Sequence, residues 1–596
     1  MSARVNLFYN TAGITICLKS FINYVFMNLK PFFLRFLIGC LFSCASILLP
    51  MEAKSQRTFC NPLNISYRFT LDKPSRRTAA DPVIILYKDY YYLFATASGG
   101  YWYSKDLLHW TFMTTKDLPF EKDAPAVTVI NGSVYYLPLN SHIIYKTNNP
   151  LSGKWEIYND AFPLAIGDPD LFQDTDGKVY LYFGCTNSEY LHAVELNVNQ
   201  KLNPIGQPVN VLTSQPEMHG WERPGDYNTQ TDRPWTEAPW VNKHNGKYYY
   251  QYSAPGTQYK SYADGYYVSD KPLGPFIYAQ SSPFSAKPEG FIDGAGHAAT
   301  FADKYGNYWH IATMTISVKH MFERRLGLFA VTFDKYGALV AHTEFGDYPM
   351  IIPNHKINDV SELFPAWMML SYRKRAESSS SLDGHPDSLA FDENIRDYWS
   401  AKTGNKGEWL SVDLGSISTV KAVQLNFAEN NTHLFGREGI LAQQYLLEYS
   451  TNNKTWKVLS DKTHNEEDLT HQYYALKIPV KARYLKVINY RVPGGTFALS
   501  GFRVFGTGTG KKPTKVSSFI AVRDTNDPRN VTLNWKKQAN ATGYNIRFGV
   551  QKDRLNRVYQ VYGDSILTIH SLNKNQQYWF AIDAFGENGV TRGDTR

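Results

Sequence analysis

The chain has 596 residues, enough for three or four domains that each bury their own core. Aromatic residues make up 15% of it, with 42 tyrosines, which is typical of strand-rich domains and of surfaces that stack on sugars. About half of the net charge of +8 lies in residues 1–55, and no run of Lys or Arg points to nucleic acid, so nucleic acid is not an expected partner.

The first 55 residues are predicted to be an export segment. From Met27 the sequence reads MNLKPFFLRFLIGCLFSCASILLPMEAKSQ: a basic start, an apolar run, and small residues that favour cleavage after Ser55. Met27 is an alternative start of the chain. The mature protein is therefore expected in the periplasm or outside the cell.

The alternative is a lipid-anchored surface protein, because LIGC (Cys40) and LFSC (Cys44) resemble lipoprotein signals. The apolar run continues past both cysteines, so we favour a soluble export signal over a surface lipoprotein. Arg35 and Pro50 interrupt a run already short of a full span, so no membrane span is expected in the mature protein.

Cysteine usage excludes a disulfide scaffold. Only Cys60 and Cys185 follow the export segment, and two cysteines form at most one bridge. No Cys or His spacing resembles a zinc site.

Five stretches of the chain share one plan: a short β-rich run, a turn, and an aromatic run. Each is typical of a β-hairpin. They are DPVIILYKDYYYLFA from Asp81, DAPAVTVINGSVYYLPL from Asp123, DPDLFQDTDGKVYLYFG from Asp168, TEAPWVNKHNGKYYYQYS from Thr236 and GHAATFADKYGNYWHIA from Gly296.

The repeat starts at 81, 123, 168, 237 and 296 are 42 to 69 residues apart, about one four-stranded propeller blade plus variable loops. Five units predict a five-bladed β-propeller, in which the first strand of each blade lines the central channel. The residues that open the repeats therefore point to the axis: Asp81, Asp123, Asp168, Glu237 and, one residue into its repeat, His297. Acids that converge on one cavity are costly unless chemistry needs them.

The motifs AADP in the first repeat, GDPDLF in the third, TEAPW in the fourth and GAGH in the fifth resemble the family 43 glycoside hydrolases over about residues 60–350. The resemblance implies that Asp81 is the general base and Glu237 the general acid. Asp168 would be the third carboxylate, a pKa modulator that orients the acid. A plain Asp-Pro turn is the alternative for Asp81, and Asp170 is the alternative to Asp168.

Substrate contacts are predicted around these acids. Asp123 stands in DAPAV, where the family usually carries Trp, and it either contacts a substrate hydroxyl or caps a turn. Trp102, beside glycines, is expected to face the sugar. Trp221 and Trp235, in the polar loop of residues 214–235, are expected to contact subsites, with plain loop packing as the alternative.

The last predicted repeat adds a histidine and an arginine. By resemblance His297 lines the channel floor, near a water-bound calcium in some relatives. No cofactor is expected to be required, and a structural calcium held through water near His297 is the one metal that the resemblance suggests. Arg324, in FERRLGLF, aligns with an arginine that reaches the sugar or the carboxylates, and Arg325 is the alternative one position away.

Beyond about Ser371 the sequence pattern changes: apolar residues alternate with polar ones, as in strands, and the turns between them are rich in Gly and Asn. SSSSLDGHPDS, YLLEYSTNNKTWKVL and FALSGFRVFG resemble a discoidin-like module, which either binds carbohydrate or serves as a spacer. GTGTGKKP is a linker. VTLNWKK, GYNIRFG and QYWFAIDAFGENG resemble a fibronectin type III sandwich.

We therefore predict an all-β chain, a five-bladed β-propeller followed by two β-sandwich domains. The predicted limits are an export segment over 1–55, the propeller over 56–370, the discoidin-like sandwich over 371–507 and the fibronectin-like sandwich over 513–596.

The predicted function is an exo-acting, inverting glycoside hydrolase that acts on a plant polysaccharide or oligosaccharide. The leading prediction is an α-L-arabinofuranosidase that removes arabinofuranosyl side chains; the alternatives are a β-xylosidase or a β-D-galactofuranosidase. A non-catalytic carbohydrate-binding propeller is the rival of another class, and it has no need of three acids at blade starts. The sequence makes no prediction of oligomeric state.

Overall fold

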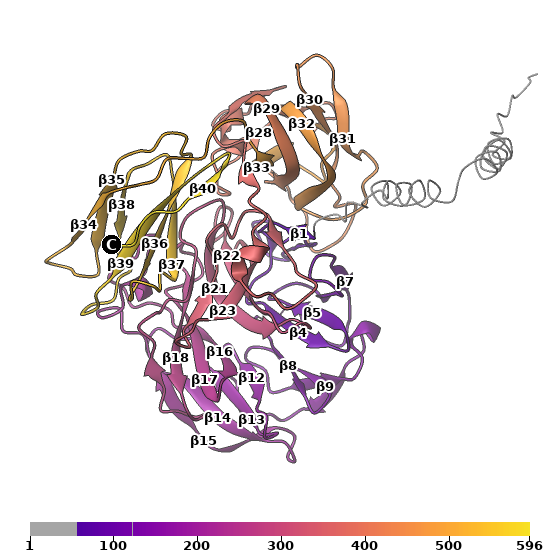
Figure 1. The fold of residues 1–596 in the computed structure, drawn as a ribbon. Helices are drawn as coiled ribbons and strands as arrows, with labels where there is room; N and C mark the ends of the chain where they lie inside the picture. Colours follow the sequence, from indigo (N-terminus) through magenta and orange to yellow (C-terminus); the bar gives the residue numbers. More distant parts are fainter. Residues whose placement is uncertain (1–56, 122) are drawn as a thin grey trace, which may run out of the picture. The chain divides into compact units, whose positions relative to one another are not determined.

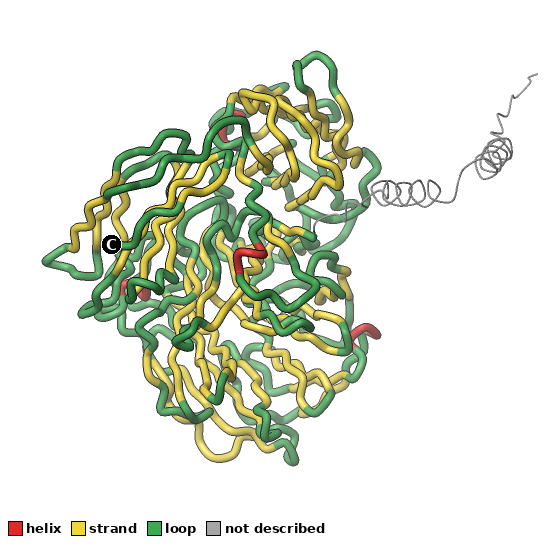
Figure 2. The backbone as a smooth tube through the Cα atoms, viewed as in Figure 1, coloured by secondary structure: helices red, strands yellow, loops and turns green. Residues whose placement is uncertain are grey.

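The computed structural model describes residues 57–121 and 123–596, which form one compact unit; the predicted export segment lies outside the described residues. Strands and loops make up almost all of this part of the chain (Figure 2). No described helix has the length and apolar character needed to cross a bilayer. The helices among the described residues are short 3₁₀ turns: η1 (Pro150–Ser152), η2 (Gly220–Glu222), η3 (Val360–Leu363) and η4 (Asp387–Ala390).

Five antiparallel sheets follow one another along the chain, each with its strands in sequence order, which confirms the predicted five-bladed β-propeller (Figure 1). Blade 1 holds β4 (Val83–Tyr87), β5 (Tyr90–Phe94), β6 (Tyr101–Ser104) and β7 (Thr111–Met113), and blade 2 holds β8 (Ala126–Ile130), β9 (Ser133–Leu137), β10 (Ile144–Thr147) and β11 (Glu156–Asn159). Blade 3 holds β12 (Asp170–Gln173), β13 (Val179–Phe183), β14 (Leu191–Asn197) and β15 (Asn203–Leu212). Blade 4 holds β16 (Glu237–His244), β17 (Lys247–Ala254), β18 (Ala263–Ser269) and β19 (Ile277–Tyr278), with β20 (Ser285–Ala286) also paired to β18. Blade 5 holds β21 (Asp293–Ala302), β22 (Tyr308–Thr315), β23 (Arg324–Phe333) and β24 (Leu339–Ala341).

The tight turns predicted from the sequence join the first two strands of each blade. In blade 2 the turn residues Asn131 and Gly132 have φ of 49° and 79°, and in blade 4 Asn245 and Gly246 have φ of 48° and 78°. Two consecutive residues with positive φ match the right-handed twist of a hairpin, which is why Asn-Gly is favoured there.

Two short strand pairings lie outside the five blades. Strand β1 (Thr58–Phe59) pairs with β25 (Met350–Ile351), so the segment before blade 1 is held by the segment after blade 5. Strands β2 (Arg68–Phe69) and β3 (Arg77–Thr78) form a hairpin that leads directly into blade 1.

The second module is built on one eight-stranded sheet. Its strands are β26 (Met368–Met369), β27 (Arg375–Ser378), β28 (Trp399–Ser400), β29 (Trp409–Phe427), β30 (Gln444–Ser450), β31 (Lys457–Lys462), β32 (His471–Arg491) and β33 (Ala498–Thr507). The long strands β29 and β32 pair along most of their length and bury an apolar core that includes Trp399, Leu485 and Phe502. Strand β26 pairs with β33 although its residues fall within the range predicted for the propeller.

The last module is a sandwich of two sheets. One holds β34 (Phe519–Arg523), β35 (Val531–Trp535) and β38 (Ile566–Ile569), and the other holds β36 (Gly543–Gly549), β37 (Arg557–Tyr562), β39 (Trp579–Gly586) and β40 (Gly589–Thr591). Trp535 and Tyr544 meet edge to face in its core, with ring centroids 5.3 Å apart. The all-β class is confirmed, whereas the fibronectin type III assignment and the module limits stay predictions.

Candidate active site

In each blade one residue has a left-handed backbone: it lies just before the inner strand in blades 1 to 3 and within that strand in blades 4 and 5, and none of the five is glycine. Their φ angles are 52° at Asp81, 40° at Ala124, 41° at Asp168, 58° at Ala238 and 41° at His297. The five residues line a small cavity together with the residues that follow them, so they are structurally equivalent and converge on one point. Strained backbone of this kind concentrates at functional sites, where the surrounding structure holds it in place.

This equivalence corrects the predicted register of two blades. Asp123 and Glu237 come one residue before the equivalent positions Ala124 and Ala238, so they are not counterparts of Asp81. The sequence conceals the offset, because Asp-Pro and Ala-Pro both stand before an apolar run. Both acids nevertheless line the same pocket as Asp81.

A cavity of about 660 Å³ opens above these residues, within the usual size of a small-molecule site. Its walls carry most of the predicted site residues and few large apolar groups. The lining residues that the sequence predicted are Asp81, Asp123, Asp168, Glu237, His297 and Arg324. A hollow of about 790 Å³ between blade 4 and the last module holds one carboxylate, Asp270, so the acid-lined cavity is the candidate active site.

Asp81 is buried at the base of the cavity and held by three side chains. Its Oδ1 lies 3.3 Å from Nη1 of Arg324 and 3.1 Å from Nδ1 of His297, and its Oδ2 accepts a 2.5 Å hydrogen bond from Thr96 Oγ1. Burial alone would raise the pKa of this carboxyl, but Arg324, His297 and Thr96 outweigh it and hold the pKa below its usual value. Asp81 is therefore kept ionised, as a base must be.

Asp168 has the opposite electrostatic character. Its Oδ2 accepts a hydrogen bond from the backbone N–H of Ala238 at 3.2 Å. Burial, with the negative charges of Glu237 and Asp81, raises its pKa to about 7 against the opposing effect of His297. Two neighbouring carboxyls with pKa values pushed apart are typical of acid and base chemistry.

Glu237 begins strand β16 and is held by two donors. The Tyr262 hydroxyl donates to Oε1, and the Cys185 thiol donates to Oε2 with Sγ 3.2 Å away. Desolvation and the charges of Glu237 and Asp168 raise the pKa of the Cys185 thiol, so it remains a protonated donor. A Cβ on Gly296 would stand 2.7 Å from the Tyr262 ring, which explains the glycine before His297 in the GAGH motif.

His297 bridges the acids. Its backbone N–H donates to Ser253 Oγ at 2.7 Å, and its Nδ1 lies 3.8 Å from Asp168 Oδ2 as well as close to Asp81. Burial lowers the pKa of His297, but the charges of Asp81, Asp168 and Glu237 outweigh burial and raise it. The imidazolium form is thus favoured between the carboxylates.

These residues do not fit a directly bound calcium. Ligand atoms of Asp168, Glu237 and His297 lie within 4.8 Å of one another, but calcium takes six to eight oxygen ligands. This set offers two carboxylates and an imidazole whose Nδ1 already faces Asp81. A calcium held through water near His297 stays a prediction, and no chemical step is assigned to it.

The two candidate arginines are separated by their contacts. Arg324 reaches Asp81 from the first residue of β23, as expected. Arg325 points away from the cavity, because its Nε donates to His471 and its Nη1 donates to the Arg77 carbonyl. Asp170, the alternative to Asp168, instead accepts the backbone N–H of Val241 between blades 3 and 4.

Two of the predicted sugar contacts are wrong. Trp102 is 0% exposed, with its Nε1 donating to Ser66 and its ring packed on Phe112. Trp221 is 1% exposed and packs on Tyr252 inside blade 4.

The loop that carries Trp221 is turned towards the last module rather than the pocket. Arg223 in this loop donates to Asp527 and to the His570 carbonyl of that module. Trp235, 44% exposed beside the acid-bearing strand, is not among the residues that line the cavity, and its substrate contact stays a prediction.

Sequence reasoning missed a set of pocket residues that the repeat itself could have identified. Thr96, Leu139 and Cys185 each lie two residues beyond the second strand of their blade, and all three line the cavity. Aligning the ends of the second strands would have found them. Tyr262 has no such signal, because it is one of many tyrosines in and between β17 and β18.

Comparisons with known proteins identify two family domains in the chain. Residues 74–338 match the model of Glycosyl hydrolases family 43, and residues 375–500 match that of the F5/8 type C domain. A beta-D-galactofuranosidase (xynD) of Aspergillus niger is 26% identical over 274 residues, 39% of this chain and 72% of that protein. A xylosidase/arabinosidase of Bacteroides ovatus is 32% identical over 152 residues, and an arabinoxylan arabinofuranohydrolase of Paenibacillus polymyxa is 30% identical over 154 residues.

The last two matches cover 22% and 24% of this chain, and they span less than half of the relatives' own length, 41% and 22%. Among solved structures, a glycoside hydrolase aligns over 72% of this chain and 97% of its own, with 18% identity and a TM-score of 0.43, which is too low to inform function.

The fold, the acid-lined cavity and the matching relatives define the class of protein: it is a glycoside hydrolase. More particularly, the chain carries a family 43 glycosyl hydrolase domain over residues 74–338, followed by an F5/8 type C domain over residues 375–500.

Proposed function

We propose that the protein is an exo-acting, inverting glycosidase, and that its leading substrate is an α-L-arabinofuranosyl side chain of a plant polysaccharide. The proposal rests on one observation: two carboxyl groups of the same cavity have pKa values shifted in opposite directions. Arg324 and His297 hold the pKa of Asp81 below its usual value, whereas burial and the charges of Glu237 and Asp81 raise the pKa of Asp168 to about 7. An inverting glycosidase needs one carboxylate as base and one carboxylic acid as proton donor.

In the proposed reaction Glu237 gives its proton to the departing glycosidic oxygen while Asp81 takes a proton from water. The water oxygen forms a bond to the anomeric carbon on the face opposite the breaking C–O bond, so the configuration inverts. The two carboxyls are expected to stand about 6.5–9.5 Å apart, which leaves room for the water. Asp168 would orient Glu237 through the Ala238 backbone, which follows Glu237 directly.

A cavity closed at its base supports action on a terminal sugar. The equivalent blade residues Asp81, Ala124, Asp168, Ala238 and His297 form this base, so a polysaccharide cannot thread through the ring. The names of the relatives, which include arabinofuranohydrolase, xylosidase and galactofuranosidase, support a furanoside or xyloside substrate. β-Xylosides and β-D-galactofuranosides are accordingly the alternatives.

The test is a panel of aryl α-L-arabinofuranoside, aryl β-D-xyloside and aryl β-D-galactofuranoside, followed by proton NMR of the first-formed sugar. The expected result is hydrolysis of the arabinofuranoside with inverted anomeric configuration. A retained anomer would overturn the base role of Asp81. Binding of polysaccharide without hydrolysis of any of the three glycosides would favour the non-catalytic propeller instead.

A further inference from the structure

The hairpin of β2 and β3 joins the candidate active site to the discoidin-like module. Its residues Thr70, Leu71, Asp72, Arg76 and Thr78 form one wall of the cavity. Three residues after β3 ends, the chain reaches Asp81. Any group that fixes this hairpin therefore also fixes the proposed base and the wall beside it.

Arg77, in β3, is the point at which the hairpin is held. Its side chain is 1% exposed, and its Nε lies 2.8 Å and 2.9 Å from the two carboxylate oxygens of Glu429. Its Nη1 lies 2.7 Å from Oδ1 of Asp468 and donates to the Tyr67 carbonyl at 2.6 Å. Glu429 and Asp468 belong to the discoidin-like module, so a propeller cation is neutralised entirely by the neighbouring module.

A second link runs through Arg325. Its Nη1 donates to the Arg77 carbonyl at 2.6 Å, and its Nε donates to His471 Nε2 at 2.8 Å. Burial and the charges of Arg325 and Arg77 lower the pKa of His471, which keeps the ring neutral and able to accept. Arg325 adjoins Arg324, the partner of Asp81, so both elements of the Asp81–Arg324 pair are tied to the discoidin-like module.

The loop that carries Glu429 is itself constrained. Glu429 has φ of 52° and Asn431 has φ of 54°, both in the left-handed region. Lys319 of the propeller donates to the Glu429 carbonyl at 2.8 Å. Further along, Phe69 and Gly436 exchange backbone hydrogen bonds, which lays the loop across the hairpin. Strain persists only where surrounding contacts over-determine a residue, and here those contacts come from the propeller.

We propose that Glu429 is a positioning residue for the active site: the discoidin-like module, through the buried Glu429–Arg77 pair, sets the place of Asp81 and of the pocket wall. This inference rests on the proposed role of Asp81 as base. The module is then part of the catalytic architecture, in addition to any carbohydrate that it binds.

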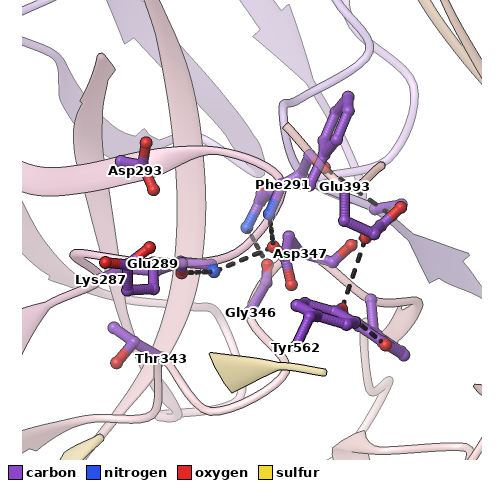
Figure 3. A network of polar contacts seen from close by, with 12 residues as sticks. Lys287, Glu289, Phe291, Asp293, Thr343, Gly346, Asp347, Glu393 and Tyr562 are labelled. Atoms are coloured by element: carbon purple, nitrogen blue, oxygen red, sulfur yellow. Dashed lines mark hydrogen bonds and ion pairs between the residues drawn. The ribbon is translucent and has the colours of Figure 1, made fainter. Parts of the chain in front are cut away.

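The chain offers a matched control in the pair formed by Glu393 and Arg503. Both pairs have side chains that are 1% and 3% exposed, and Glu393 also has a left-handed backbone, with φ of 62°. Arg503 likewise crosses to the propeller, where it donates to the Asp347 carbonyl at 2.7 Å. Figure 3 labels Glu393 and Asp347 of this junction, and none of the residues labelled there lines the active-site cavity.

The experiment compares E429Q, E393Q and E429D in the full-length protein by melting temperature and by kcat and KM on the aryl glycoside that the wild type hydrolyses. Both Gln variants should lower the melting temperature, because each removes a buried carboxylate that contacts an arginine through both of its oxygens. E429Q should also lose about tenfold or more in kcat, with KM within about twofold, because a small misplacement of a reacting group is costly. E393Q should keep wild-type kcat, and E429D should recover part of the loss.

Equal kcat for E429Q and E393Q would overturn the inference while leaving the proposed function intact. A wild type that hydrolyses none of the glycosides would instead overturn the proposed function. Should E429Q fail to fold, E429D takes its place, because it keeps the charge but shortens the side chain that reaches Arg77. About a threefold loss of kcat in E429D supports the inference, and wild-type kcat overturns it.

Discussion

Nη1 of Arg324 lies 3.3 Å from Oδ1 of Asp81, although the two residues stand at opposite ends of the propeller sequence. Arg324 begins strand β23 of the last blade, and Asp81 precedes the first strand of blade 1. The pair therefore spans the seam at which the ring of blades closes. Besides Arg324, the groups His297, Asp168 and Tyr262 interact electrostatically with Asp81, and Glu237 lines the same cavity.

Replacing Arg324 should change the pH dependence of hydrolysis. Arg324 is the strongest influence that lowers the pKa of Asp81, so R324Q should raise that pKa. A base acts only when ionised, and the acid limb of the kcat/KM profile should therefore move to higher pH, with activity lost first at low pH. R324K keeps the charge and is the matched control. A profile of R324Q parallel to that of the wild type would contradict this role.

Glu237→Gln should abolish hydrolysis of substrates with poor leaving groups. Without a proton donor the loss on an arabinan oligosaccharide is expected to be about 10²–10⁴-fold. An activated aryl glycoside needs little protonation, so the loss there should be much smaller. Glu222→Gln is the control, since Glu222 is fully buried and contacts Tyr252 away from the cavity. Near wild-type turnover of the oligosaccharide by E237Q would remove Glu237 from the acid role.

The fold was predictable because its signals are local. Turn residues such as Asn131-Gly132 and Asn245-Gly246, set between alternating runs, determine hairpins within about 17 residues of sequence, and five such hairpins imply five blades. The carboxylates were found for the same reason, since Asp81 and Asp168 stand at the start of their repeats.

What the sequence did not reveal depends on distant contacts or on backbone conformation. The left-handed φ of Ala124 and Ala238 has no residue-type signal, so the offset of Asp123 and Glu237 was missed. Trp221 was assigned to sugar because its loop is polar. The loop is polar because Arg223 binds Asp527, which lies 304 residues further along the chain.

Glu289 should make the stability of the protein depend on pH. It lies at the junction of Figure 3, where Lys287 donates to its carbonyl. Burial and the neighbouring Asp293 raise the pKa of the Glu289 carboxyl to about 7. A pKa raised on folding contributes stability that is present in acid and is lost as pH rises from about 4.5 to about 7.

Glu289→Gln should therefore flatten this pH dependence and stabilise the protein at pH 8, by on the order of 2 kcal/mol. Urea denaturation of both proteins at pH 5 and pH 8 measures the difference. The exposed Glu466, changed to Gln, is the control for the loss of one negative charge. An E289Q curve that falls with pH as steeply as the wild-type curve would contradict the prediction.

A chain cut to residues 56–370 should be unstable and inactive, even though it retains all five blades and every residue that lines the cavity. The cut leaves Arg77 without Glu429 and Arg223 without Asp527. Breaking a buried pair by removing one partner costs about 3–5 kcal/mol, and the loss of Glu429 alone removes a large part of the stability of a typical domain.

The truncated chain and residues 56–596 should be compared by thermal unfolding and by activity on the aryl glycoside. Adding R77M to the truncated chain removes the uncompensated charge and should recover solubility without recovering full activity, because the hairpin beside Asp81 still lacks its support. A truncated chain with wild-type kcat would show that the propeller positions Asp81 alone.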